Sequence, residues 1–212
     1  SDFLPMYFYK PMLKKKLDDK DLGESNIYFC PQTLIKIHPD FDEILKKILQ
    51  NDSRAKIIFI KDNGGILVKK LMQRFKKTIF NNLERISFID QMGINDYINY
   101  CGKASVLLDP LYFGAGNSFH ESMYYGTPTI TMPTNNIKSR IVLGAYNQMQ
   151  LKNPPIFKDI NNYINSAIEI ANLKKNTLIE TKKYFRECAD KNLFENEKFI
   201  KESENIFLKL VN

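Results

Sequence analysis

The sequence has few of the residues that build disulfide frameworks or metal centres. It contains 3 cysteines, 2 histidines and no tryptophan in 212 residues. Cys30, Cys101 and Cys188 are odd in number, lie far apart and form no C-x-x-C pair, which argues against a disulfide framework and a zinc site. His38 and His120 are too few for a histidine-rich metal centre. We therefore expect no metal and no other cofactor, and a reducing, cytoplasmic location.

Long apolar runs are also missing. No stretch approaches the roughly 20 apolar residues that a membrane-spanning helix needs, so we expect no membrane span. The N-terminus lacks both an initiator Met and the basic-then-apolar arrangement of a signal peptide, which suggests an excised piece of a longer chain. A composition of 43% hydrophobic and 26% charged residues is that of a globular protein with one domain or one large lobe.

The net charge of +7 allows an anionic partner, such as a nucleic acid, a membrane surface or a small anion. The only dense basic run, residues 14–16, is followed at once by Asp18, Asp19 and Asp21, which locally cancel its field. Basic and aromatic residues do not interleave as in proteins that bind single-stranded nucleic acid. We expect no nucleic-acid partner, although a non-enzymatic basic binding module remains an alternative.

From residue 26 on, short apolar runs of strand length alternate with amphipathic segments of helix length. Residues 1–25 are predicted to be a linker or arm from a missing N-terminal lobe, and residues 26–212 to form one domain. Strands separated by helix-length segments imply βαβ units, a parallel sheet and helices on both faces. The predicted fold is therefore α/β, a Rossmann-like doubly wound parallel sheet with a helical C-terminal tail. Strands are expected over 26–30, 56–60, 85–89, 104–108 and 129–132, and helices over 40–50, 66–79, 95–101, 117–125, 137–145 and from 159 onward.

Ligands of such sheets bind beyond the carboxyl ends of the strands, which selects the loops after residues 30, 60, 89 and 108. The last of these loops is glycine-rich and ends at a predicted helix start, where unpaired amides attract phosphate. Gly114 and Gly116 permit a close approach, and Asn117 and Ser118 can add side-chain donors. Glu121, on the same helix face, can accept hydrogen bonds from ribose hydroxyls. The alternative is a glycine-rich turn capped by Asn or Ser, with Glu121 stabilising the helix dipole.

Two other loops offer candidate contacts to a nucleotide. Lys36 is a cation among apolar residues, which can neutralise a diphosphate and stabilise it as a leaving group; the alternative is a surface lysine. Backbone groups from Met92 to Ile94 can read a uracil edge, and Tyr97 can stack on the base or ribose, the alternative being ordinary packing. His120 is expected to face solvent or the sheet edge and not to act as a base.

Together these segments resemble the O-GlcNAc transferase family. That family includes protein O-GlcNAc transferases, Spindly-type O-fucosyltransferases and bacterial cytoplasmic N-glucosyltransferases. The resemblance covers residues 26–210, and its most specific part is the segment G-T-P-x-(I/V)-T-M-P. The motifs that carry it are residues 36–39 (KIHP), 108–110 (LDP), 116–121 (GNSFHE) and 126–133 (GTPTITMP).

The resemblance implies the C-terminal half of a two-lobed GT-B glycosyltransferase. Such a lobe binds a nucleotide sugar, usually UDP-linked, for inverting transfer to a protein or glycan acceptor. By position, Lys36 matches the lysine on the donor diphosphate, and residues 116–118 match the segment that cradles the phosphates. Glu121 matches an aspartate that holds the ribose. Tyr97 falls where some members have a histidine near the nucleoside, and Thr33 falls where protein O-GlcNAc transferases have a glutamine.

This sequence departs from the family pattern in three ways. Residues 116–118 read Gly-Asn-Ser, whereas the eukaryotic transferases have His-Thr-Thr at this place. The Gly-Asn start is closer to the bacterial N-glucosyltransferases. Glu121 is one methylene longer than the family aspartate. No N-terminal lobe is present, so we expect that lobe as a partner and expect this piece to be inactive alone. Other GT-B proteins, such as a sugar-nucleotide epimerase or a glycan-synthesising transferase, remain alternatives because many carry a glutamate at the same place.

Overall fold

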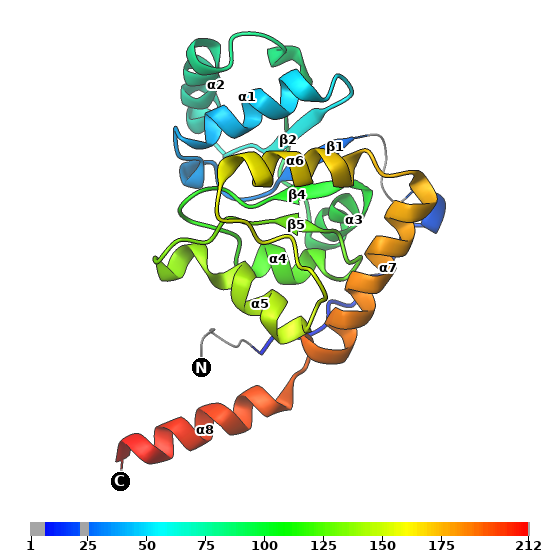
Figure 1. Ribbon diagram of the computed structural model, residues 1–212, viewed down its shortest axis with the longest axis vertical. Helices are drawn as coiled ribbons and strands as arrows, with labels where there is room; N and C mark the ends of the chain where they lie inside the picture. The colour runs from blue at the N-terminus through cyan, green and yellow to red at the C-terminus, as the bar shows by residue number, and fades with distance from the viewer. Residues whose placement is uncertain (1–6, 22–25, 212) are drawn as a thin grey trace.

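The computed structural model describes residues 7–21 and 26–211, and its centre is a five-stranded, all-parallel sheet (Figure 1). The strands run in the order β3-β2-β1-β4-β5, so the direction of winding reverses between β1 and β4. This doubly wound arrangement confirms the fold predicted from the alternation of strand-length and helix-length segments. The strands are β1 (Ile27–Cys30), β2 (Lys56–Ile60), β3 (Ile86–Ile89), β4 (Val106–Leu108) and β5 (Thr129–Ile130).

The helices follow the predicted order, and two of them differ from their predicted bounds by more than two residues. The helix expected over 117–125 ends at Ser122 and continues as turns to Gly126, and the one expected over 137–145 is a 3-10 turn followed by a separate helix. The side chain of Asn136 caps the 3-10 turn by accepting the N–H of Lys138, and the turn closes at Arg140, whose N–H donates to the carbonyl of Ile137. The helices are α1 (Phe41–Asn51), α2 (Ile66–Thr78), α3 (Ile94–Lys103), α4 (Asn117–Ser122), α5 (Ile141–Met149), α6 (Ile160–Ala171), α7 (Lys175–Asn192) and α8 (Glu197–Val211), with 3-10 turns η1 (Asp19–Asp21), η2 (Leu34–Lys36), η3 (Leu83–Arg85) and η4 (Ile137–Ser139).

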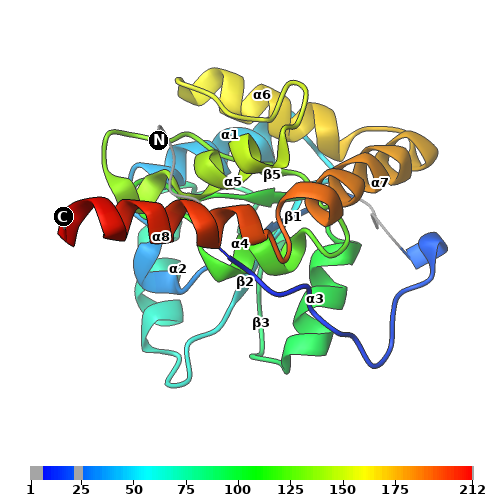
Figure 2. The ribbon, with the colours of Figure 1, turned by 90° about the horizontal axis from the view of Figure 1, so that it is seen from below.

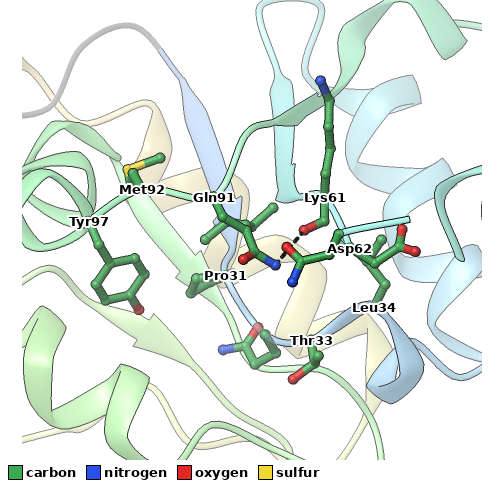
Figure 3. Close-up of a pocket in the computed structure, with 11 residues that line it drawn as sticks. Pro31, Thr33, Leu34, Lys61, Asp62, Gln91, Met92 and Tyr97 are labelled. Atoms are coloured by element: carbon green, nitrogen blue, oxygen red, sulfur yellow. Dashed lines mark hydrogen bonds between the residues drawn. The ribbon is translucent and has the colours of Figure 1, made fainter. Parts of the chain in front are cut away.

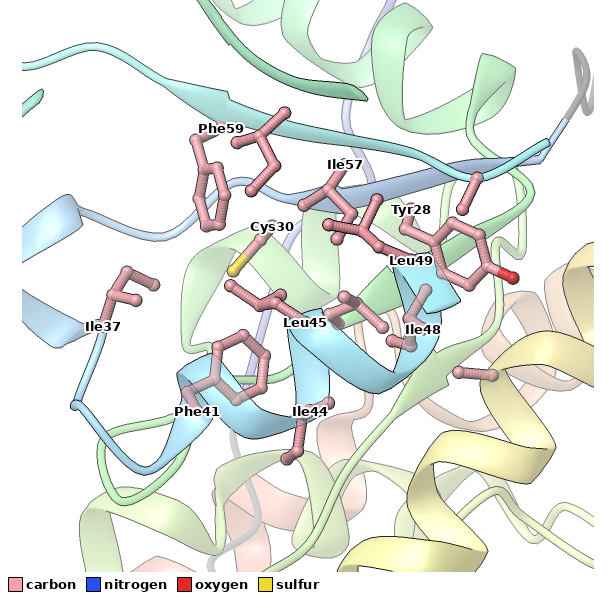
Figure 4. Packing of buried hydrophobic residues seen from close by; sticks show 14 of the residues in the cluster. Tyr28, Cys30, Ile37, Phe41, Ile44, Leu45, Ile48, Leu49, Ile57 and Phe59 are labelled. Carbon is pink, nitrogen blue, oxygen red and sulfur yellow. The ribbon is translucent and has the colours of Figure 1, made fainter. Parts of the chain in front are cut away.

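The apolar strand runs are buried on both faces, as a parallel sheet requires. Tyr28 and Phe59 point into a cluster with α1, α2 and α6, whereas Phe29 and Ile58 point to the opposite side, against α3. The apolar stripe of α1 recurs at helical spacing and lies on β1 and β2 (Figure 4). Each buried side chain of this kind stabilises the fold by about 1.5–3 kcal/mol. The stripe consists of Phe41, Ile44, Leu45, Ile48 and Leu49.

Helix α7 packs across the end of α3 and against the turn that precedes β5. The buried Lys182 donates its Nζ hydrogens to the carbonyls of Gly102, at 2.7 Å, and Ala104, at 2.5 Å. Gly126 has a φ of +67° and lies directly under the backbone of α7. The left-handed glycine predicted after the 117–125 segment is therefore observed, and its missing side chain admits the helix.

The described part of the predicted arm, residues 7–21, packs along the domain. Phe8 pairs with Phe194 in a β-bridge and its ring stacks on His120 at 4.8 Å. The N–H of Leu17 donates to the hydroxyl of Tyr125 at 2.8 Å. Residues 1–6 and 22–25 lie outside the described residues. The origin of the arm in a further lobe stays a prediction.

The last helix, α8, extends away from the body of the domain (Figure 1), and Figure 2 shows the same helix from below. None of its residues is buried, and most of its large apolar side chains are exposed. The helical C-terminal tail predicted from the sequence is thus observed. In the described ranges, no helix is both long enough and apolar enough to cross a membrane. The exposed apolar side chains of α8 are Ile200, Ile206, Phe207, Leu208, Leu210 and Val211.

Candidate functional site

The carboxyl ends of β1 and β4 lie side by side where the strand order reverses, which is the ligand position in doubly wound sheets. Lys36 belongs to η2, directly after β1, and its Nζ donates to the carbonyl of Gly114 at 3.1 Å. Gly114 lies in the loop between β4 and α4, 78 residues further along the chain. The lysine and the glycine-rich loop, which the sequence singled out separately, therefore meet at one edge of the sheet.

A second cation shares this corner of the molecule. The Nζ of Lys36 lies 4.0 Å from the ring centroid of Phe113, and the Nζ of Lys138, from η4, lies 5.2 Å from the same centroid. Burial lowers the pKa of Lys36, while the nearby carboxyl of Asp109 acts in the opposite direction. Two ammonium groups close to one aromatic ring make this corner, beside the loop, positively charged.

The buried side chain of Asp109 holds the loop between β4 and α4. The sequence analysis included Asp109 in the 108–110 motif but did not predict this role. Asp109 Oδ1 accepts the N–H of Ala115 at 2.5 Å, and Oδ2 accepts the hydroxyl of Thr131 at 2.7 Å. A Cβ on Gly114 would come within 2.8 Å of both carboxyl oxygens, so only glycine leaves room for them. The loop is thus fixed before any ligand arrives.

Asp109 predicts a pH dependence of stability. Burial raises its pKa from an ordinary 3.8 to about 7, against hydrogen bonds from Thr131 and Ala115 and the charge of Lys36, which lower it. Between these two values the folded state binds more protons than the unfolded state, so this group's stabilisation is lost as pH rises from about 4 through 7. We expect the melting temperature of the natural protein to fall over this range more steeply than that of Asp109→Asn, measured by circular dichroism. Melting temperatures of the natural protein and of Asp109→Asn that fall equally with pH would contradict this expectation.

Two adjoining cavities open along the ends of β1, β2 and β3, and the second of them reaches α4. The larger, about 440 Å³, is lined by the loops after these three strands (Figure 3). The smaller, about 370 Å³, lies between the 92–97 segment and α4. Pro31, Met92 and Tyr97 line both cavities, which makes them one continuous surface.

Most of the predicted donor-binding residues meet at these cavities. Met92, Ile94, Tyr97, Ser118 and Glu121 line the smaller one, although they come from the loop after β3, from α3 and from α4. Burial raises the pKa of the half-buried Glu121. Tyr97 is only 8% exposed, and its hydroxyl faces the carbonyl of Ser118 at 3.4 Å.

The remaining predicted residues lie differently. Thr33 is exposed and lines the larger cavity only. Lys36, Gly116 and Asn117 line neither of the two cavities. Gly116 is the N-cap of α4 and Asn117 begins it, beside the corner that holds Lys36. The structure therefore brings together a nucleoside-sized cavity and an adjoining cationic edge.

The sequence analysis did not predict most of the residues that line the larger cavity. Gln91 donates its side-chain N–H to the carbonyl of Lys61 at 3.2 Å, and Lys61 Nζ pairs with Asp90 at 3.0 Å. The carboxylate of Asp62 accepts the N–H groups of α2 and thereby fixes the same loop. The rule that ligands bind beyond strand ends had selected this loop without naming residues. The unpredicted lining residues are Pro31, Gln32, Leu34, Ile60, Lys61, Asp62, Asn63 and Gln91.

The expectation that His120 faces solvent was wrong, because its side chain is 1% exposed. Its Nδ1 lies 3.1 Å from the carbonyl of Gly116, and Phe8 of the arm covers its ring. Burial lowers the pKa of this imidazole. The arm comes from a distant part of the chain, so local periodicity could not show this contact.

Among residues 7–21 and 26–211, no group of three or more His, Cys, Asp or Glu side chains is arranged to hold a metal ion. The expectation that neither a metal nor another cofactor takes part stays a prediction.

No protein-family profile and no curated protein sequence matches the chain. Its fold matches a point mutant of the Thermobaculum terrenum O-GlcNAc transferase, with a TM-score of 0.79 and 19% identity over 93% of this chain and 37% of that one. It also matches S. aureus TarM, solved with fondaparinux, α-GlcNAc-glycerol and UDP, with a TM-score of 0.65 and 13% identity over 95% and 38% of the chains. Sucrose-phosphate synthase from Thermosynechococcus elongatus follows with a TM-score of 0.58 and 17% identity over 89% and 46%.

The chain spans less than half the length of each of these structures, and the identities are low, so the likeness concerns the fold. The three known structures are GT-B glycosyltransferases. The all-parallel five-stranded sheet, its flanking helices and its C-terminal helices agree with one half of that architecture. The chain thus has the Rossmann-like fold of a GT-B C-terminal lobe, like that of the O-GlcNAc transferase family which its motifs resemble.

Proposed function

We propose that this chain is the donor-binding lobe of a glycosyltransferase that uses a nucleoside-diphosphate sugar, with UDP as the nucleotide. The observation that carries the proposal is the contact between Lys36 and the carbonyl of Gly114 at the reversal point of the sheet. It joins a cation to a fixed, glycine-containing loop at the edge where ligands of this fold class bind. The UDP in the TarM structure is consistent with this choice of ligand.

In the proposed pose, the diphosphate, the ribose and the base of the nucleotide each meet a different group of these residues. The diphosphate lies between Lys36 and the first amides of α4, at Asn117 and Ser118, where unpaired N–H groups and an ammonium group favour negative charge. The ribose meets Glu121, and the base enters the cavity between Met92 and Tyr97. In inverting transfer, the diphosphate leaves with growing negative charge, and these fixed donors stabilise that charge.

Replacement of Lys36 by methionine tests the proposal. Methionine keeps much of the side-chain volume and removes the charge, so we expect the affinity for UDP to fall about tenfold to thirtyfold, as titration calorimetry would measure. Lys47→Met is the matched control, because Lys47 lies on α1, where its Nζ contacts Glu43 at 3.8 Å and Asn161 of α6 at 3.5 Å, and its loss changes the net charge equally. Equal UDP affinity for Lys36→Met and the natural sequence would remove Lys36 from the site.

The acceptor and the reacting partner groups belong to the part of the longer proteins that this chain does not span. Because it covers 37% of the O-GlcNAc transferase structure, we propose that it binds donor and transfers sugar only with an N-terminal lobe. The acceptor is then a protein or glycan. Product analysis with a two-lobed protein distinguishes transfer from hydrolysis and from epimerisation, the alternative raised by the sequence.

A further inference from the structure

Gly114 joins two segments that each carry a lysine. Its carbonyl accepts a hydrogen from the Nζ of Lys36, in η2, at 3.1 Å, and its N–H donates to the carbonyl of Lys138, in η4, at 3.0 Å. The side chain of Asn136 accepts the N–H of Lys138 at 3.1 Å and thereby fixes the start of η4. Two lysines that are far apart in the sequence are therefore held at the same loop.

The ring of Phe113, the residue before Gly114, lies close to both ammonium groups. The Nζ of Lys36 is 4.0 Å from its centroid and the Nζ of Lys138 is 5.2 Å from it. An aromatic ring attracts cations within about 6 Å of its centroid, so Phe113 favours the presence of both lysines at this corner. The ring is 41% exposed, which leaves the corner open to a ligand from solvent.

The residue before Phe113 has a strained backbone. Tyr112 has a φ of +67°, in the left-handed region that residues with a side chain rarely adopt. Its hydroxyl donates to Asp40 at 2.6 Å, and its ring meets that of His38 edge-on at a centroid distance of 4.9 Å. Strain of this kind persists only where surrounding contacts hold it, and it is concentrated at ligand sites. The start of α1 thus holds the turn from which Phe113 projects.

The protein does not neutralise the charge of the two lysines. Lys138 is exposed and forms no salt bridge within residues 7–21 and 26–211. The carboxyl that acts on Lys36 is that of Asp109, whose pKa burial raises to about 7, so it carries only part of a charge at neutral pH. Like charges held near each other repel, and an anion bound by both removes that repulsion. The corner therefore suits a ligand with more than one anionic centre.

We propose that Lys138 binds the donor diphosphate together with Lys36, and that the Phe113 ring positions both ammonium groups for it. This inference rests on the proposed function, which places the diphosphate at this corner but assigns only one lysine to it. Lys138 comes from the segment after β5, which the sequence analysis did not select. Because Lys138 is more exposed than Lys36, water and salt screen its charge more, so we expect its contribution to be the smaller of the two.

The test is calorimetric titration of UDP into the natural protein and into Lys138→Met. We expect the UDP affinity to fall about fivefold, because the variant loses one charge-assisted contact with phosphate. Lys138→Arg should stay within about twofold of the natural protein, since arginine also binds phosphate. Lys47→Met again controls for the change in net charge. Uridine, which has no phosphate, should bind Lys138→Met and the natural protein equally in an NMR titration.

The salt dependence distinguishes a contact with phosphate from a distortion of the site. At about 1 M salt, where the Debye length is about 3 Å, the UDP affinities of Lys138→Met and the natural protein should differ by less than about twofold. The loss in Lys36→Met should persist there, because Lys36 is half-buried and less screened. A loss in Lys138→Met that is independent of salt, or that is equally large for uridine, overturns the inference.

Two substitutions of Phe113 test its positioning role. Leucine keeps an apolar side chain but removes the aromatic ring, so UDP affinity should fall about threefold in Phe113→Leu. Tyrosine keeps the ring, so Phe113→Tyr should bind UDP as the natural protein does. Equal UDP affinities in these two variants overturn the role of Phe113.

The outcomes separate this inference from the proposed function. If Lys36→Met binds UDP more weakly while Lys138→Met binds it as the natural protein does, the role of Lys138 is overturned and the donor site stands. Failure of the natural protein to bind UDP overturns both proposals.

Discussion

Gly126→Ala is expected to destabilise the fold by about 4 kcal/mol, enough to leave much of the chain unfolded at 37 °C. An added Cβ would lie 2.0 Å from the carbonyl oxygen of Lys182 and 2.5 Å from the nitrogen of Arg186. Both atoms belong to the backbone of α7 and cannot turn aside as a side chain does. The φ of +67° adds about 1–2 kcal/mol of strain for any residue with a side chain. Urea unfolding measures the effect.

Gly93→Ala is the matched control for this substitution. Gly93 is the N-cap of α3 with a φ of −64°, and nothing lies within 4 Å of the position its Cβ would take. Its alanine variant should unfold within about 1 kcal/mol of the natural protein. Similar urea midpoints for the variants at 126 and 93 would show that α7 does not press on Gly126 in solution.

Lys182→Met should destabilise the fold by about 3 kcal/mol. Methionine fills most of the volume but leaves the buried carbonyls of Gly102 and Ala104 without the donor they share. Burial lowers the pKa of Lys182 from an ordinary 10.5 to about 7, so the unfolded state binds more protons between these values. The stability gap between the natural protein and the variant should therefore widen as pH rises from 7 to about 10.

Chemical denaturation at three pH values checks this expectation. Lys183→Met is the control, because Lys183 is exposed and lies 3.9 Å from Glu187 across one turn of α7. Surface pairs of this kind contribute about 0.3–0.5 kcal/mol, so the control should change little. A gap between Lys182→Met and the natural protein that is constant with pH would mean that Lys182 carries a full charge in the fold.

Local patterns were enough to predict the sheet and the position of the ligand edge. The strand predicted over 56–60 is observed with the same bounds, the one predicted over 104–108 is observed over 106–108, and the left-handed Gly126 follows from its place after a helical segment. The break near Arg140 was missed because a helix over 137–145 was predicted as one piece, whereas residues 137–139 form a 3-10 turn that closes when the Arg140 N–H donates to the carbonyl of Ile137.

The site was predicted only where a residue type alone suggests chemistry. Lys36 and Glu121 could be chosen because a charge among apolar residues at a strand or helix end is distinctive. The role of Asp109 depends on partners at 115 and 131, which only the fold brings to its carboxylate. Pairings between distant elements of this kind are not encoded in spacing.

The bond between Lys182 and the end of α3 also affects how the chain can fold on a ribosome. The two partners are separated by 80 residues, so the carbonyls of Gly102 and Ala104 emerge long before the ammonium group that satisfies them. At ordinary rates of translation the delay is about 4–16 s. During that interval α3 lacks its final cap, and residues 26–130, although they contain every strand, should stay exposed to proteases until α7 has been synthesised.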